Sequence, residues 1–336
     1  MVKPGVFSFE IPDLYRTTRN ERKGTFVNPW QASLKRANLS KFFKTRLDKT
    51  LNYPVGKPLP TLPFTEERCN AFMNSKLAVW WLGHSSCLCN LNGRLILTDP
   101  ILGNAGVGPL GMVRKAPAPI TAWSELPGVD TVLCSHNHFD HLSVDSMRDI
   151  EKAFHPTFVC GTGVEPLLTK AGVPEERIHA CSWWDRADIG GMTVTFVPAQ
   201  HWSRRGVHDR NQTLWGGFVA ELDGKRLFYP GDTGYNKGLF QTIAQLGPMD
   251  LSLLPIGCGH PEAVAGYQHV HSEGALRIHD DVGSRCSLAI HHGTYPTGLA
   301  TESLQSPGAE MAGLAGQRGK GDVHVGQVGM VVMAEE

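Results

Sequence analysis

The sequence has no excess charge of either sign and no long hydrophobic run. Lys plus Arg and Asp plus Glu are both 32, so the formal net charge is +0. The chain therefore has no overall field that would attract nucleic acid. None of its 336 residues lie in an apolar run of about 18, the length that a membrane-spanning helix needs. We therefore expect neither a nucleic-acid partner nor a membrane-spanning segment.

The chain also lacks the cysteine pattern of small secreted domains. Its eight cysteines are scattered, mostly within apolar runs, and form no dense framework. Residues 1–24 lack the apolar stretch of a signal peptide and contain acidic residues, which transit peptides rarely have. We therefore expect reduced thiols in an intracellular protein that is not secreted. It would be cytoplasmic or bound peripherally to an internal membrane.

Two segments of different character are expected. Residues 1–76 contain a short basic amphipathic piece at 34–47 and a proline-rich stretch at 54–63, which predicts an N-terminal arm packing on the core. Residues 77–336 predict the main domain. Its expected strands are 78–82, a hairpin at 86–98 turning at Asn92-Gly93, 131–134, 157–160, 192–197, 218–222, 226–229, 251–255 and 286–290. Its expected helices are 144–153 after a Ser143 cap and 273–279 after a Ser272 cap, and 306–321 is expected to be loop.

Histidine is the abundant residue that stands out, with 15 copies. The segment 134–141 reads CSHNHFDH and places four potential metal ligands directly after a β run. In an extended chain His136, His138 and Asp140 point to one side, and the following turn can bring His141 back. One tetrahedral ion with an open position uses fewer ligands than this. The segment therefore indicates two metal ions.

Other polar residues also follow the ends of expected strands: Asp99, His201, Asp232 and His291. If these ends meet at one edge of a sheet, they build a site from separate loops on a rigid scaffold. A solitary histidine at a strand end is more often an ordinary hydrogen-bonded residue. We interpret six histidines in that way, namely His84, His155, His179, His208, His279 and His324.

Taken together, these residues resemble a known family signature. His136-x-His138-x-Asp140-His141, followed by His201, Asp232 and His291, is similar to the signature of the dinuclear zinc hydrolases of the metallo-β-lactamase superfamily. Further motifs resemble the family of N-acyl-phosphatidylethanolamine-hydrolysing phospholipases D: WLGH at 81–84, LTDP at 97–100, PAQHW at 198–202, LWG at 214–216, GDTGY at 231–235 and YQHV at 267–270. The resemblance covers residues 24–300 approximately.

The resemblance implies an α+β fold of the metallo-β-lactamase-like type, a four-layer αββα sandwich, over the hydrolase domain at 77–336. Two Zn²⁺ ions are expected at one edge of the sheets. The implied ligands are His136, His138 and His201 for one ion and Asp140, His141 and His291 for the other, with Asp232 bridging them. His292 is the alternative to His291, and the family pattern favours the first of the pair. Asp99 is expected to accept a hydrogen bond from a ligand imidazole and so fix its tautomer.

The implied activity is a zinc-dependent phosphodiesterase acting on N-acyl-phosphatidylethanolamine or a related phospholipid. It would release N-acylethanolamine and phosphatidic acid through a metal-bridging hydroxide, at a membrane surface to which the protein binds peripherally. Asp140 and Asp232 are the expected catalytic carboxylates. His269 matches the position that contacts substrate and could protonate the leaving oxygen. Phe139 lies at another substrate position, where mammalian members have tyrosine.

Alternative interpretations keep part of this chemistry. A lactonase or a soluble phosphodiesterase of the same fold would use the same metals on another substrate. A di-iron oxidoreductase typically has a carboxylate where His138 stands, so the imidazole favours zinc hydrolysis. An inactive lipid-binding scaffold is disfavoured because every implied ligand position is filled. A homodimer is compatible with the resemblance.

Overall fold

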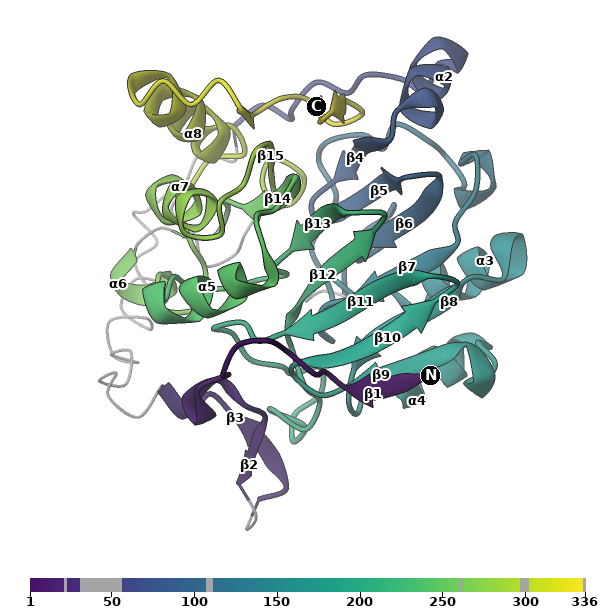
Figure 1. Cartoon of the computed structure of the whole chain (residues 1–336). Coiled ribbons are helices and arrows are strands. Elements are labelled where there is room, and N and C mark those ends of the chain that lie inside the picture. Colours follow the sequence, from purple (N-terminus) through teal and green to yellow (C-terminus); the bar gives the residue numbers. More distant parts are fainter. Residues whose placement is uncertain (21–22, 31–55, 107–110, 260–261, 297–301, 335–336) are drawn as a thin grey trace.

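The computed structural model describes residues 1–20, 23–30, 56–106, 111–259, 262–296 and 302–334. Two mixed β-sheets face each other, and helices cover their outer sides (Figure 1). This arrangement confirms the α+β fold, an αββα sandwich, that the sequence predicts. The amphipathic piece predicted at 34–47 lies outside the described residues.

The first sheet, here called the N-terminal sheet, has the order β17-β4-β5-β6-β7-β8-β9 in the described part of the chain. Its strands are β4 (Leu77–Gly83), β5 (Ser86–Leu91), β6 (Arg94–Thr98), β7 (Thr131–Cys134), β8 (Thr157–Gly161), β9 (Ile178–Cys181) and β17 (Val331–Met333). Strands β6 to β9 run parallel to one another, whereas β4 and β5 form an antiparallel start.

The second sheet, the C-terminal sheet, has the order β1-β10-β11-β12-β13-β14-β15-β16 over the same described ranges. Its strands are β1 (Val2–Pro4), β10 (Asp185–Ile189), β11 (Met192–Val197), β12 (Gly217–Leu222), β13 (Lys225–Tyr229), β14 (Leu251–Pro255), β15 (Ser287–Ile290) and β16 (Val323–His324). A separate hairpin pairs β2 (Thr18–Asn20) with β3 (Thr25–Val27).

Helices lie outside both sheets (Figure 1). On the N-terminal sheet these are α3 (Val144–Phe154) and α4 (Glu165–Ala171), with α2 (Glu66–Asn74) near β4. On the C-terminal side these are α5 (Lys237–Ile243), α6 (Glu262–Ala265), α7 (Ser272–Asp281) and α8 (Ser306–Gln317). Short 3₁₀ turns are η1 (Asp13–Tyr15), η4 (Trp123–Glu125), η5 (Glu175–Arg177) and η6 (Ala244–Leu246).

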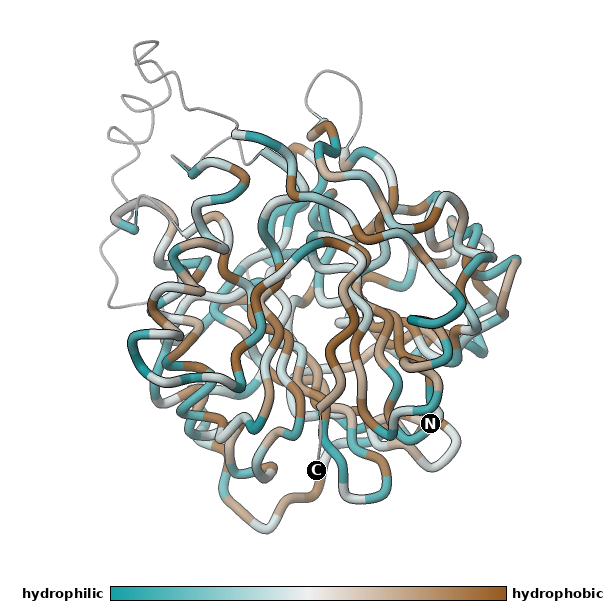
Figure 2. The backbone as a smooth tube through the Cα atoms, turned by 90° about the horizontal axis from the view of Figure 1, so that it is seen from above, coloured by the Kyte–Doolittle hydropathy of each residue, from teal (hydrophilic) through white to brown (hydrophobic). Residues whose placement is uncertain are grey.

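Both faces of strand β4 are buried, which explains the continuous apolar run at residues 77–82. Alternate residues face opposite sides of a strand. Trp81 packs in the core between the two sheets, and Trp80 packs in the outer core against the rings of Phe64 and Phe72. No position of β4 therefore needs a polar side chain. Figure 2 shows the same pattern across the molecule, with hydrophobic segments gathered inside and hydrophilic ones around them.

Several local predictions are confirmed. The turn between β5 and β6 has positive φ at Asn92 (49°) and Gly93 (86°), as a type I′ hairpin requires. Helix α3 begins after Ser143, whose side chain accepts a hydrogen bond from the Ser146 N–H. All eight cysteines are free, and six of them are buried.

Two local predictions are wrong. Residues 306–317 form helix α8, although their glycine content suggested a loop. Pro307 fits its first turn, and Met311 and Ala315 are buried, so packing against α7 outweighs the low propensity of glycine. Ser272 is the first residue of α7 and not its cap, since His271 occupies the position before it.

The N-terminal arm is more ordered than its composition suggests. Strand β1 pairs antiparallel with β10 and extends the C-terminal sheet, and α2 lies near β4. Phe26 and Trp30 are buried in the core between the sheets. The division at residues 76 and 77 stays a prediction. Within the described residues, no helix is both long and apolar enough to cross a membrane.

Candidate metal centre

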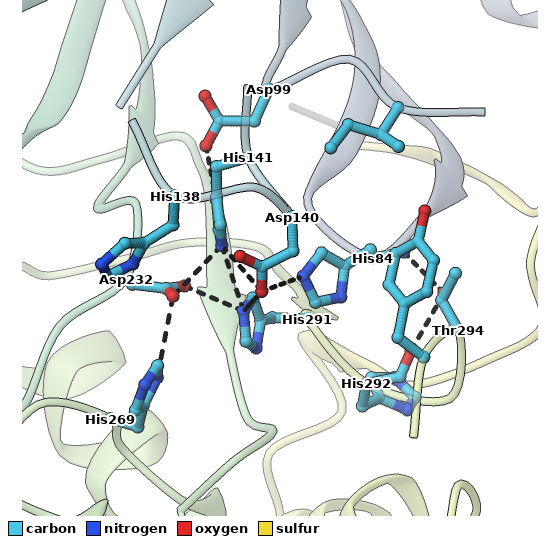
Figure 3. Close-up of polar contacts among 12 residues, drawn as sticks. His84, Asp99, His138, Asp140, His141, Asp232, His269, His291, His292 and Thr294 are labelled. Carbon is cyan, nitrogen blue, oxygen red and sulfur yellow. Dashed lines mark hydrogen bonds and ion pairs between the residues drawn. The ribbon is translucent and has the colours of Figure 1, made fainter. Parts of the chain in front are cut away.

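The predicted site residues follow strands whose carboxyl ends point the same way. In the N-terminal sheet β4, β6 and β7 share one direction, as the antiparallel pairs β4-β5 and β5-β6 and the parallel pair β6-β7 require. In the C-terminal sheet β11, β13 and β15 share one direction for the same reason. Loops after these six strands carry the predicted metal ligands and Asp99, as well as His84, and His269 lies between α6 and α7, after β14. Figure 3 shows that most of these side chains meet at one edge, and the donor atoms of His136 and His201 lie within 4.8 Å of that of His138.

A first group of donors consists of His136, His138 and His201, all within 4.8 Å of one another. The Nδ1 atom of His138 lies 2.8 Å from Nε2 of His136 and 3.2 Å from Nε2 of His201. Three ring nitrogens therefore face a common point. The other ring nitrogen of His138, Nε2, is buried without a hydrogen-bond partner.

A second group consists of Asp140, His141 and His291, joined by His84. The Nε2 atoms of His141 and His291 are 3.2 Å apart. Oδ2 of Asp140 lies 3.9 Å from the first and 4.0 Å from the second. Two imidazole nitrogens and one carboxylate oxygen thus face one another, which is a donor set that suits Zn²⁺.

Asp232 lies between the two groups. Its carboxylate is 3.1 Å from Nε2 of His141 and 3.1 Å from Nε2 of His291. The same carboxylate is 3.8 Å from Nε2 of His201 and 4.0 Å from Nε2 of His136. This buried carboxylate is therefore within reach of both groups at once, the geometry that a bridging ligand needs.

Asp99, at the end of β6, fixes the tautomer of one imidazole directly and of another through a hydroxyl. The Nδ1–H of His141 donates to Asp99 Oδ2 over 2.7 Å, which leaves the lone pair on Nε2. Ser135 Oγ donates to the same oxygen, so its 2.9 Å contact with Nδ1 of His136 uses the hydroxyl as acceptor. The Tyr229 hydroxyl also donates to Asp99. Asp99 thus accepts a hydrogen bond from one of the predicted ligand imidazoles, and its role behind a bound metal ion stays a prediction.

The protonation states of most donors suit metal binding. His141 is the exception, because Asp232 and Asp140 raise its pKa against the effect of burial, and its ring would have to lose a proton to bind a metal ion. Burial lowers the pKa of His138 to about 4 and of His201 to about 3, so both rings are neutral near pH 7. Burial disfavours the charged form of Asp232, but His141 and His291 outweigh it and hold the pKa of Asp232 well below its usual value. Neutral imidazoles beside an ionised carboxylate are the forms that bind divalent metal ions.

The structure separates His291 from its neighbour His292. His291 faces His141 and Asp232, whereas the ring of His292 packs on Trp81 at 4.9 Å between centroids. Both ring nitrogens of His292 are buried without a partner, away from the other donors. His291 is thus the member of the pair that can serve the site (Figure 3).

The two predicted substrate residues border the centre. Nδ1 of His269 lies 3.7 Å from Oδ2 of Asp232, and its ring is stacked near His291 at 5.8 Å. His269 is also close enough to Asp232 and His201 to form a third donor group with them. Phe139 is partly buried, and the Arg205 guanidinium lies 4.2 Å from its ring centroid.

Sequence reasoning missed His84. Its place in the sequence predicts an ordinary strand-end histidine, but its Nε2 atom lies 3.3 Å from Oδ2 of Asp140. The signal was its place directly after β4, which ends at the same edge as β6 and β7. The distance of 52 positions from His136 hid the contact, because the pairing of β4 with β5 and β6 is not visible in a linear reading.

Fold and site together define a class of protein: a metal-dependent hydrolase built from two sheets with paired donor groups at one edge. Residues 94–292 match the family model described as the beta-lactamase superfamily domain. The chain therefore belongs to the metallo-β-lactamase superfamily.

Two relatives and one solved structure are similar to this chain over most of its length. An uncharacterized protein of Mycobacterium tuberculosis is 34% identical, covering 82% of this chain and 74% of its own length. N-acyl-phosphatidylethanolamine-hydrolyzing phospholipase D 1 of Caenorhabditis elegans is 31% identical, covering 80% of each chain. Igni18, a metallo hydrolase from Ignicoccus hospitalis, has the same fold with a TM-score of 0.59 at 23% identity, covering 76% of this chain and 97% of its own.

Proposed function

We propose that the protein is a zinc-dependent phosphodiesterase that hydrolyses N-acyl-phosphatidylethanolamine, or a related phospholipid, to N-acylethanolamine and phosphatidic acid. The observation that carries the proposal is the position of Asp232, which reaches both donor groups at distances of 3.1–4.0 Å. The similarity to the nematode phospholipase D supports the substrate class.

Seven residues would hold two Zn²⁺ ions. They are His136, His138 and His201 for one ion, Asp140, His141 and His291 for the other, and Asp232 for both. When bound, such a pair of ions supplies Lewis acidity and makes water a nucleophile near neutral pH. Imidazole-rich donor sets suit zinc, which supports zinc as the resident metal.

The chain's own residues would then prepare the site for a phosphodiester. Asp99 and the Gln268 carbonyl, which accepts from Nδ1 of His201 over 2.9 Å, hold two imidazoles in fixed tautomers. His269 borders the centre with part of its ring exposed. Burial lowers its pKa to about 3, so it would meet substrate as a neutral ring whose N–H can donate to a phosphate oxygen or to the leaving oxygen. Phe139 offers substrate an apolar surface.

The protein would be cytoplasmic or bound peripherally to an internal membrane, where it would meet a phospholipid substrate at the membrane surface. A phospholipid substrate resides in a bilayer, and no helix of the described ranges is able to span one. Monomer and homodimer are both compatible with this role.

The decisive experiment is incubation of zinc-loaded protein with vesicles containing N-acyl-phosphatidylethanolamine, followed by lipid analysis. Phosphatidic acid and N-acylethanolamine should appear in equal amounts, and chelation should stop their release. Full zinc loading with no phosphatidic acid would refute the proposal. Turnover of lactones or soluble phosphodiesters in the same preparation would identify the alternative hydrolases.

A further inference from the structure

His84 stands behind Asp140 in a conformation that costs free energy. Its φ is 51°, in the left-handed region that residues other than glycine seldom adopt, although asparagine, aspartate and histidine do so more often than the rest. Strained backbone of this kind persists where the surrounding structure holds it, and it is often found at functional sites. The residues around His84 must therefore hold its backbone in this conformation.

The backbone of His84 is held from several directions. Its N–H donates to Thr294 Oγ1 over 2.7 Å. Its carbonyl oxygen accepts from the backbone N–H of His291 and from the indole N–H of Trp81, each over 2.9 Å. His84 is thus tied directly to the backbone of His291, a member of the second donor group.

The ring of His84 is equally fixed. It is buried between the rings of His291, at 4.1 Å between centroids, and Tyr295, at 5.0 Å. With Asp140 ionised, the 3.3 Å contact from Nε2 to Oδ2 is a hydrogen bond that His84 donates.

Asp140 needs such support more than the other carboxylate of the centre does. Its side chain is 20% exposed, whereas that of Asp232 is 2% exposed. Asp140 lies in a turn, and the oxygen that His84 contacts is the one that faces the Nε2 atoms of His141 and His291. Without the donor, this carboxylate could rotate toward solvent.

We propose that His84 is a positioning residue for the second metal ion: its Nε2–H holds the Asp140 carboxylate in the direction that ion binding requires. The inference rests on the proposed metal centre. It gives Asp140 the same kind of support that Asp99 gives to His141, where loss of a partner behind a ligand typically weakens metal binding 10–100-fold.

The test compares His84→Gln with His84→Asn. The side-chain nitrogen of Gln can occupy the position of Nε2, whereas Asn is one methylene shorter and cannot reach Asp140. Asn also tolerates positive φ better than Gln, so backbone strain would favour the Asn variant. Affinities for a first and a second ion are measured by Co²⁺ titration of metal-free protein, followed by absorption and by chelator competition.

We expect His84→Asn to bind the second ion about 10–100-fold more weakly and the first ion as wild type does. His84→Gln should stay within about threefold of wild type for both ions. Added zinc should restore turnover in His84→Asn, which a general folding defect would not allow. Equal second-ion affinity in the two variants, or equal weakening of both ions in His84→Asn, would overturn the inference.

His279→Asn is the matched control. His279 is also buried and also contacts a carboxylate, with Nε2 3.1 Å from Asp322 Oδ2, but it lies in α7 outside the centre. This variant should lose stability and keep both ion affinities. Failure of wild type to bind two ions would refute the proposed function and is distinguishable from failure of the His84 inference, which needs a wild-type protein that binds both.

Discussion

Two buried carboxylates, Asp232 and Asp99, contact the imidazoles of the predicted metal centre in different ways. Asp232 is buried and contacts imidazoles of both donor groups, whereas Asp99 touches only the far side of His141 and reaches His136 through Ser135. The two residues should therefore respond differently to loss of their charge.

Asp232→Asn should remove metal and activity together, because a neutral amide cannot neutralise two cations. His269→Ala should keep both ions and lower turnover by about 10²–10⁴-fold, the usual contribution of a general acid or base. Metal content by elemental analysis, measured beside turnover, separates the two outcomes. Loss of both ions in His269→Ala would show that His269 is a ligand and not a substrate residue.

Asp99→Asn should weaken metal binding by about 10–100-fold, since the amide does not hold the tautomer of His141 as a carboxylate does. Tyr229→Phe is the control: it removes one donor to Asp99 and leaves the His141 contact intact. Its metal affinity should change much less, as equilibrium dialysis would show. Equal effects of the two substitutions would contradict the role given to Asp99.

At the scale of elements, helix α3 begins three residues after His141, and we expect its cap to limit motion of the loop that carries the ligands. The Ser143 side chain accepts from the Ser146 N–H at this helix start. Thr65 caps α2 in the same way, accepting from the Arg68 N–H, at a helix whose start lies outside the centre.

Ser143→Ala and Thr65→Ala should each lower the free energy of unfolding by about 1 kcal/mol, the usual value of an N-cap. Only Ser143→Ala should also weaken metal binding, because only α3 continues the ligand loop. Urea unfolding of the metal-free proteins and metal titration measure the two effects. Equal metal affinities in the two variants would mean that the start of α3 does not restrain the loop.

At the scale of the whole molecule, the centre joins the two sheets. Asp99, His136 and His141 come from loops of the N-terminal sheet, and His201, Asp232 and His291 come from loops of the C-terminal sheet. An ion bound between them links both halves of the sandwich.

Metal removal should therefore destabilise the entire fold. Ligand binding to the native state adds about 4 kcal/mol at a free metal concentration a thousandfold above Kd. Chelation should lower the unfolding midpoint in a single cooperative transition observed by circular dichroism. An unchanged midpoint after complete removal of zinc would show that the sheets do not depend on the ions.

The metal-free protein should also lose stability as pH falls from about 6.5 toward 4. Burial lowers the pKa of His138 to about 4 and of His201 to about 3, so the unfolded chain binds more protons in this window. Each extra proton costs about 1.4 kcal/mol per pH unit. His141, whose pKa is raised by Asp232 and Asp140 against the effect of burial, contributes stability that is lost as pH rises through its folded pKa. Urea midpoints measured across this range test the sign.

The local sequence determined much of this protein. The turn at Asn92-Gly93, the Ser143 cap and the strands at 131–134, 192–197 and 251–255 follow from residue preferences over a few positions. The donor cluster at 136–141 is equally local, because imidazole and carboxylate groups at that density have few uses other than metal binding.

Only the tertiary structure decided the rest. Helix α8 forms because Met311 and Ala315 find a buried surface near α7, which no propensity of that segment reveals. His84 reaches Asp140 because β4 shares its direction with β6 and β7. After β15, His291 faces His141, whereas the ring of His292 packs on Trp81. Each of these depends on contacts between segments far apart in the chain, and such contacts are set by the pairing of strands and not by neighbours in sequence.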